Sequence, residues 1–122
     1  MINKIVKEVF EIEANQIAQL SNQLTSDFEK SIQAILSSKG KVIISGMGKS
    51  GIIGKKIAAT LASTGTPSFF LHPGEAYHGD LGMIEKNDVV ILISNSGETD
   101  EILKLIPFIK NQENITISMS GN

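Results

Sequence analysis

Two glycine-containing turns carry the side chains that could do chemistry. Residues 46–51, Gly-Met-Gly-Lys-Ser-Gly, offer one ammonium group and one hydroxyl. Residues 94–99, Ser-Asn-Ser-Gly-Glu-Thr, offer three hydroxyls, an amide and a carboxylate. Glycine lets a backbone approach a ligand closely, and the unpaired amides at a helix N-terminus attract anions. Hydroxyls and amides together can surround a phosphoryl group without a metal, so both turns predict phosphate binding.

The first turn has three interpretations. The phosphate loop of nucleotide hydrolases is excluded because it needs a glycine five residues before Gly48, where this chain has Ile43. The dinucleotide fingerprint Gly-x-Gly-x-x-Gly is matched by Gly46, Gly48 and Gly51. That fingerprint also expects an acidic residue at the end of the next strand, and residues 71–73 are Leu-His-Pro. A plain strand-to-helix turn with a surface lysine remains the third interpretation.

The second turn has one competing explanation, in which Ser96 or Thr99 only caps the helix that follows. Capping accounts for one hydroxyl but not for a run of them after a buried strand. Open α/β sheets bind their ligands at the carboxyl ends of strands, which favours the phosphate interpretation.

Two helices are expected before the first strand. Apolar residues from Ile2 to Leu24 recur mostly every three or four positions and predict one amphipathic helix. Residues 26–29, Ser-Asp-Phe-Glu, have the form of a capping box, so a second helix should begin with Ser26 as its N-cap and end at Gly40. Its inward side is expected to carry Phe28, Ile32, Ile35 and Leu36.

The rest of the chain alternates strands and helices. Short Val- and Ile-rich runs predict strands over 41–45, 68–71, 89–93 and 115–118, and helices are expected over about 50–63 and 99–111. Pro107 should kink the second of these helices, since its ring nitrogen has no hydrogen to donate to Leu103. The fold class is therefore α/β, a doubly wound parallel sheet preceded by N-terminal helices. Residues 1–122 are expected to be one domain, with a helical lead-in at 1–39 and a sheet-helix core at 40–122.

The last expected strand is followed by only four residues, so no helix of this chain can cover it. Parallel sheets are normally covered on both faces. We therefore expect the chain to be the N-terminal part of a longer one, truncated at its C-terminus.

Composition excludes several classes of partner and site. The 122 residues carry a net charge of −2, and the 11 Lys and Arg are scattered, so neither nucleic acid nor a membrane surface is an expected partner. The absence of Cys excludes disulfides, thiol nucleophiles and Cys-ligated metals. No signal peptide or membrane-spanning stretch is recognisable, which predicts a cytoplasmic protein.

Five segments, residues 46–51, 63–67, 72–76, 78–83 and 93–99, resemble the sugar isomerase (SIS) domain family. The likeness runs from about Gly40 to the C-terminus. The Ser-x-Ser-Gly-Glu-Thr element is typical of SIS domains broadly, and the stretch from His72 to Met83 resembles more narrowly the arabinose-5-phosphate isomerases. The resemblance implies the flavodoxin-like strand order of that family.

The same resemblance implies a function. It implies interconversion of ribulose 5-phosphate and arabinose 5-phosphate, a step towards the acid sugar of lipopolysaccharide or capsule, with a phosphorylated pentose as ligand and a homotetramer as assembly. Lys49 and Glu101 match functional positions of the family. His72 and His78 match substrate contacts, and His72 a position that can take a divalent metal. A further Glu and a His that the family uses would lie after residue 122.

An aldose–ketose isomerase moves a proton between neighbouring carbons through an enediol, which requires a base, a proton donor and positive charge but no cofactor. Glu101 is the candidate base and Lys49 the candidate cation, although each could equally be a plain surface charge. The candidate substrate-binding residues are Ser50, His72, His78, Ser94, Asn95, Ser96 and Thr99. The competing function is a non-catalytic regulatory SIS module that senses a phosphosugar, for which the two turns would look the same.

Overall fold

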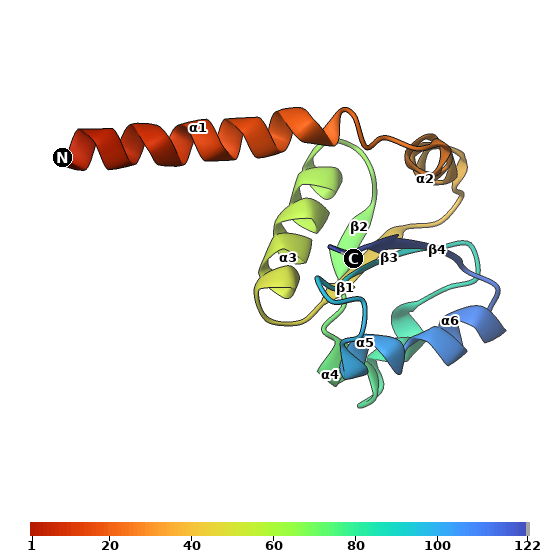
Figure 1. The fold of residues 1–122 in the computed structure, drawn as a ribbon. Coiled ribbons are helices and arrows are strands. Elements are labelled where there is room, and N and C mark those ends of the chain that lie inside the picture. Colours follow the sequence, from red (N-terminus) through yellow and green to blue (C-terminus); the bar gives the residue numbers. More distant parts are fainter. Residues whose placement is uncertain (122) are drawn as a thin grey trace. The chain divides into compact units, whose positions relative to one another are not determined.

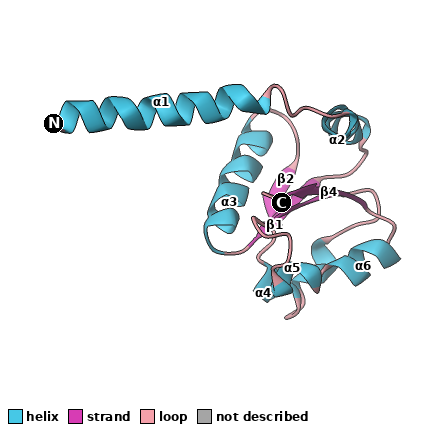
Figure 2. Cartoon of the chain, viewed as in Figure 1, coloured by secondary structure: helices cyan, strands magenta, loops and turns pink. Residues whose placement is uncertain are grey.

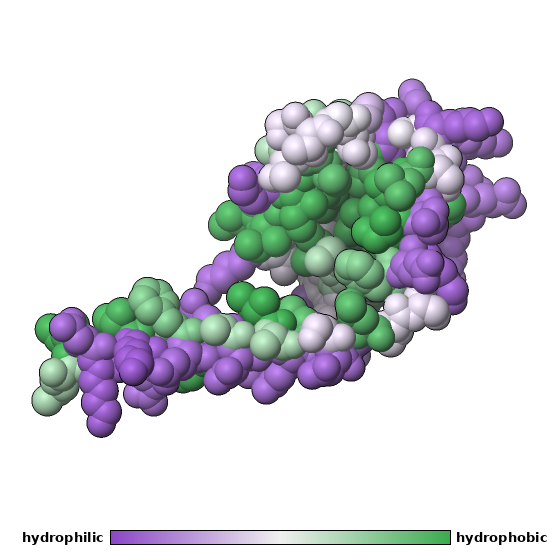
Figure 3. Space-filling model, turned by 90° about the horizontal axis from the view of Figure 1, so that it is seen from above, coloured by the Kyte–Doolittle hydropathy of each residue, from purple (hydrophilic) through white to green (hydrophobic). Residues whose placement is uncertain are grey.

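The computed structural model describes residues 1–121 and divides the chain into two compact units, Met1–Ile32 and a second unit that begins at Gln33. The first unit contains α1 (Ile2–Leu20), a helix without a buried residue. Figure 3 shows apolar residues forming a band along this helix. α2 (Ser26–Ser37) begins in the first unit and ends in the second.

The second unit is built on a four-stranded parallel sheet in the order β2-β1-β3-β4. Its strands are β1 (Val42–Gly46), β2 (Ser68–Phe70), β3 (Val89–Ile93) and β4 (Ile115–Met119). The central strands β1 and β3 are almost wholly buried, whereas β4 lies at the sheet's edge and is largely exposed. The order is the beginning of a flavodoxin-like sheet, as the sequence predicts.

Helices cover the two faces of this sheet (Figures 1 and 2). α3 (Gly48–Ser63) packs on one face, where Ala58 joins Val42, Ile44 and Ile91 in a buried cluster. The other face carries α4 (Pro73–Ala76), the short 3-10 helix η1 (Asp80–Met83), α5 (Asp100–Leu103) and α6 (Ile106–Asn111). Because both faces of the central strands are buried, these strands read as continuous apolar runs.

The expected helix over 99–111 is two short helices. α5 ends at Leu103 and α6 begins at Ile106, and Pro107 occupies the first turn of α6. Pro107 has no amide hydrogen for a bond to Leu103, so the predicted kink is a complete break. The connection between β2 and β3, expected to be an irregular Gly-rich segment, contains α4 and η1.

The expectations for α2 are partly wrong. Ser26 is not the N-cap but the first helical residue, and the capping hydroxyl is that of Thr25, whose Oγ1 accepts a hydrogen bond from Asp27 N at 3.3 Å. Of the four residues expected to point inward, Ile35 packs against the α3-side core. Phe28, Ile32 and Leu36 are exposed.

No helix among residues 1–121 has the length and apolar character needed to cross a membrane.

Candidate functional site

Parallel pairing brings the turns after β1, β3 and β4 to one edge of the sheet. Gly46 is the register partner of Ile93, and Ile93 is the partner of Met119. The turn after β3 is also joined to the end of β4, because Ser94 N donates to Met119 O at 3.0 Å. The two turns singled out in the sequence are therefore neighbours at the carboxyl edge, where open α/β sheets bind ligands.

The glycines of the first turn are explained by its geometry. A Cβ on Gly51 would overlap the Gly46 carbonyl, and Gly48 has a φ of 57°, in the left-handed region that favours glycine. This close packing starts α3 directly after β1. Lys49 and Ser50 thus lie in the first turn of a 16-residue helix, with Lys49 exposed and Ser50 half-buried. The N-cap, Met47, provides no capping side chain.

The second turn is closed by its own hydroxyls. Ser94 Oγ lies 2.7 Å from Thr99 Oγ1 and accepts a hydrogen bond from Gly97 N at 3.1 Å. Ser96 Oγ accepts one from Glu98 N at 3.0 Å. The helix that follows has only four residues, so its dipole offers little to an anion. The anion-binding capacity of this turn therefore rests on its hydroxyls and backbone amides.

An open depression of about 320 Å³ lies between these turns. It is lined by two of the candidate residues, Ser50 and Asn95, by the strand residues Ile93 and Met119, and by Ser120 and Gly121. The sequence reasoning missed Ser120 and Gly121. Their position directly after a strand, at the carboxyl edge that the other turns share, is the signal that could have identified them.

His72 is held at the carboxyl end of β2. It caps α4, with Nδ1 accepting a hydrogen bond from Gly74 N at 3.0 Å. The carbonyl just before it, that of Leu71, accepts a hydrogen bond of 2.6 Å from the buried Ser45 Oγ. With Nδ1 acting as an acceptor, a neutral His72 ring carries its proton on Nε2.

The other two candidates with a chemical role are exposed. Glu101 lies on α5, one residue beyond the start of that helix. His78 lies in the turn between α4 and η1, where its backbone amide donates to Glu75 O at 2.9 Å. Neither side chain lines the depression.

A cluster of three or more His, Asp or Glu side chains able to hold a metal ion is not found among the described residues. The metal role of His72 would therefore need ligands beyond those that residues 1–121 assemble.

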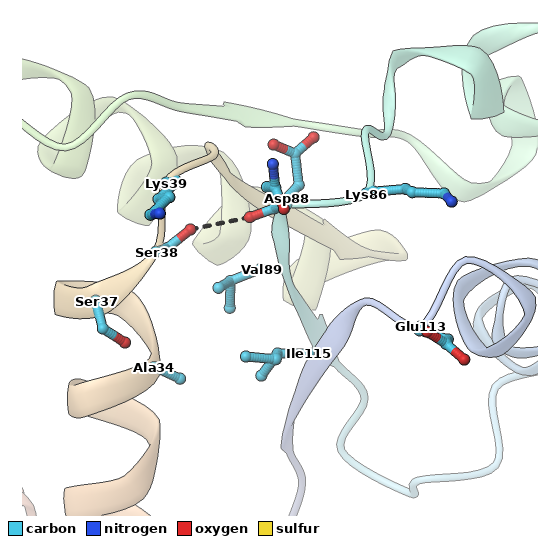
Figure 4. A pocket seen from close by; sticks show the side chains of 10 residues that line it. Ala34, Ser37, Ser38, Lys39, Lys86, Asp88, Val89, Glu113 and Ile115 are labelled. Carbon is cyan, nitrogen blue, oxygen red and sulfur yellow. Dashed lines mark hydrogen bonds between the residues drawn. The ribbon is translucent and has the colours of Figure 1, made fainter.

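A second cavity, of about 330 Å³, lies at the opposite edge of the sheet, where β3 and β4 begin (Figure 4). Its lining includes Ser38, Lys39, Lys86, Asp88 and Ile115 and none of the candidate site residues. Figure 4 shows Lys39 and Lys86 on opposite sides of Asp88.

A family model described as the SIS domain matches residues 35–122. The chain is 58% identical to the arabinose 5-phosphate isomerase KdsD of Yersinia pestis, over 95% of this chain and 35% of that protein. It is 55% identical to the arabinose 5-phosphate isomerase KpsF of Escherichia coli, over 96% of this chain and 37% of that protein. The chain therefore spans little more than a third of the length of these curated relatives.

Solved structures agree with the family match. A structure from E. coli CFT073 in complex with arabinose 5-phosphate superposes with a TM-score of 0.91 at 49% identity, and the match covers 99% of this chain and 64% of the other. The family model, the strand order and the two turns at the carboxyl edge agree, and the chain belongs to the SIS domain family.

Proposed function

We propose that the protein interconverts ribulose 5-phosphate and arabinose 5-phosphate through an enediol. The observation that carries the proposal is the pairing of β1 with β3, which places a lysine-bearing turn beside a hydroxyl-rich turn around one depression. The names of the curated relatives support the choice of sugar, as does the sugar phosphate bound in the similar E. coli structure.

The phosphate is proposed to bind between the two turns. Hydroxyls of Ser50, Ser94, Ser96 and Thr99 and backbone amides of the turns are suited to a tetrahedral anion. Asn95 lines the same depression as Ser50 and so can contact the ligand beside the phosphate. Because the Ser94–Thr99 contact already closes the second turn, little ordering remains to be done when the ligand binds.

Proton transfer is proposed to use Glu101 as the base. A carboxylate on the exposed side of α5 can take the proton that moves between the two carbons of the enediol. The ammonium group of Lys49 would stabilise the negative charge that develops on the enediolate oxygen. His72 and His78 would contact the sugar, His72 by donating from Nε2, since Nδ1 is held by Gly74.

This chemistry balances without a cofactor, because the proton that leaves one carbon is returned to the next and no electrons are lost. A divalent metal bound to His72 remains a secondary proposal. We further propose that the protein is cytoplasmic, assembles as a homotetramer and supplies acid-sugar synthesis for lipopolysaccharide or capsule.

The competing function is a regulatory SIS module that binds a phosphosugar without converting it. Lys49 and Glu101 favour the enzyme, because a sensor needs no base. The deciding experiment is a coupled assay of ribulose 5-phosphate formation by the whole protein, compared with Lys49→Met and Glu101→Gln. Turnover that both substitutions reduce by about a hundredfold or more would support the enzyme, in line with the usual effect of one acid–base group. Arabinose 5-phosphate binding without turnover by the unaltered protein would support the sensor.

A further inference from the structure

The loop after β4 forms one wall of the depression, although none of its residues carries an assigned role. Ser120 and Gly121 line the depression together with Ser50 and Asn95. The loop is tied to the turn after β3 by the hydrogen bond from Gly121 N to Asn95 O, of 2.9 Å. The position of Gly121 relative to Asn95 is therefore fixed by the backbone.

Gly121 needs to be glycine for space and not for conformation. Its φ lies outside the left-handed region. A Cβ at this position would overlap Oδ1 of Asn95 and lie 3.4 Å from Asn95 Cγ and 3.2 Å from Asn95 O. The tightest contact is thus with the tip of an exposed side chain, and the backbone contact needs only a small adjustment.

Other glycines of the chain are constrained in a different way. At Gly40 a Cβ would overlap the backbone of Asn87, and at Gly51 it would overlap the Gly46 carbonyl, so a side chain there would disturb the fold. A methyl group at residue 121 can be accommodated by rotating the Asn95 carboxamide away. The expected cost of such a methyl group therefore falls on the site and not on the fold.

We propose that Gly121 is a positioning residue for Asn95, keeping free the space in which the Asn95 carboxamide lies at the rim of the depression. The carboxamide offers both a donor and an acceptor, which suits a sugar hydroxyl beside the phosphate. The identity of this ligand rests on the proposed function. The position of the Asn95 side chain does not, because it follows from the contacts of the chain alone.

The test in the absence of ligand is an NMR comparison of the unaltered chain with Gly121→Ala. The side-chain amide signals of Asn95, identified by their loss in Asn95→Ala, should move. Those of Asn114, whose Nδ2 donates to Glu85 O at 2.8 Å at the opposite edge, should stay where they are. Asn95 signals that remain unchanged in Gly121→Ala would overturn the proposal.

The second arm measures arabinose 5-phosphate affinity in a double-mutant cycle. Gly121→Ala should weaken binding about fivefold in the unaltered chain, the value of one hydrogen bond, but less than about twofold in Asn95→Ala. Gly82→Ala is the matched control, because a Cβ there meets no atom within 4 Å. Equal losses in both backgrounds would contradict the proposal. If the unaltered chain does not bind arabinose 5-phosphate, it is the proposed function that fails, and the Asn95 signals still decide the role of Gly121.

Discussion

Ser94 Oγ and Thr99 Oγ1 lie 2.7 Å apart, so the first and last hydroxyls of the turn after β3 hold each other. Ser94 is only 6% exposed, and its Oγ also receives the Gly97 amide. The turn is therefore shaped by its own side chains before a ligand arrives. Either hydroxyl can serve as the donor in this pair, which leaves the pair able to reorient towards an anion.

Thr99→Val should weaken arabinose 5-phosphate binding about fivefold and lower the free energy of unfolding by about 1 kcal/mol, since it removes one hydrogen bond at nearly constant shape. Isothermal titration and urea unfolding measure the two quantities. Thr64→Val is the matched control, because Thr64 Oγ1 bonds only within the end of α3. A control that loses as much affinity as Thr99→Val would refute the role of this hydroxyl.

Ser96→Ala should weaken arabinose 5-phosphate but leave the binding of unphosphorylated arabinose almost unchanged. The expected loss is about tenfold, the value of a hydrogen bond to a charged group. Titration with the two sugars separates a phosphate contact from a general change in the turn. The same loss for both sugars would contradict the phosphate assignment.

Asp88→Ala should lower the free energy of unfolding by about 3 kcal/mol, because the buried carboxylate accepts from the backbone amides of two segments. Its oxygens bond Lys41 N at 2.7 Å and Glu85 N at 2.8 Å. Asp88→Asn keeps one acceptor oxygen and should lose less. The exposed Asp80→Ala serves as the control in urea unfolding, and equal stability of all three variants would rule out this role.

The stability of the chain should fall at high pH in a way that depends on Lys41. The hydrogen bond to Glu85, followed by the charge of Asp88, holds the pKa of Lys41 above its ordinary value of 10.5. A raised pKa stabilises the folded state below pH 10.5, and that contribution is lost as the pH rises through the folded-state pKa. Unfolding curves from pH 9 to about 12 should therefore converge for the unaltered chain and Lys41→Met. Lys86→Met should not change the slope, and a parallel offset at every pH would contradict this reasoning.

Self-association through α1 is expected, because an amphipathic helix with no buried residue is poorly stable alone in water. Light scattering at micromolar concentration should detect an oligomer. Replacing Ile5 and Val9, both exposed, with Ser should shift it towards monomer without unfolding the second unit. A monomeric unaltered chain would count against this prediction.

Much of the fold could be predicted from local pattern. β3 runs from Val89 to Ile93 as expected, because a strand buried on both faces is a continuous apolar run that periodicity detects directly. The break between α5 and α6 follows from Pro107, whose lack of an amide hydrogen is a local property. These features depend on the residues themselves and not on distant neighbours.

The site could be predicted only in part. Ser50 and Asn95 line one depression as their position after neighbouring strands suggests, but the contribution of Gly121 depends on a tertiary contact with Asn95 that no local pattern encodes. The sequence misplaces the N-cap of α2 by one residue, since Thr25 and Ser26 are both good capping residues and only the geometry selects Thr25. Helix starts are uncertain at this level from sequence.

The edge position of β4 affects how the 122-residue chain behaves in concentrated solution. Ile115 and Met119 are about half exposed, and the strand pairs with β3 as the last member of the sheet order. A parallel edge strand with apolar side chains is a template onto which another chain can add a strand. Concentrated preparations of this polypeptide should accordingly aggregate by edge-to-edge β-pairing, and a lysine in place of Ile115 should keep them dispersed.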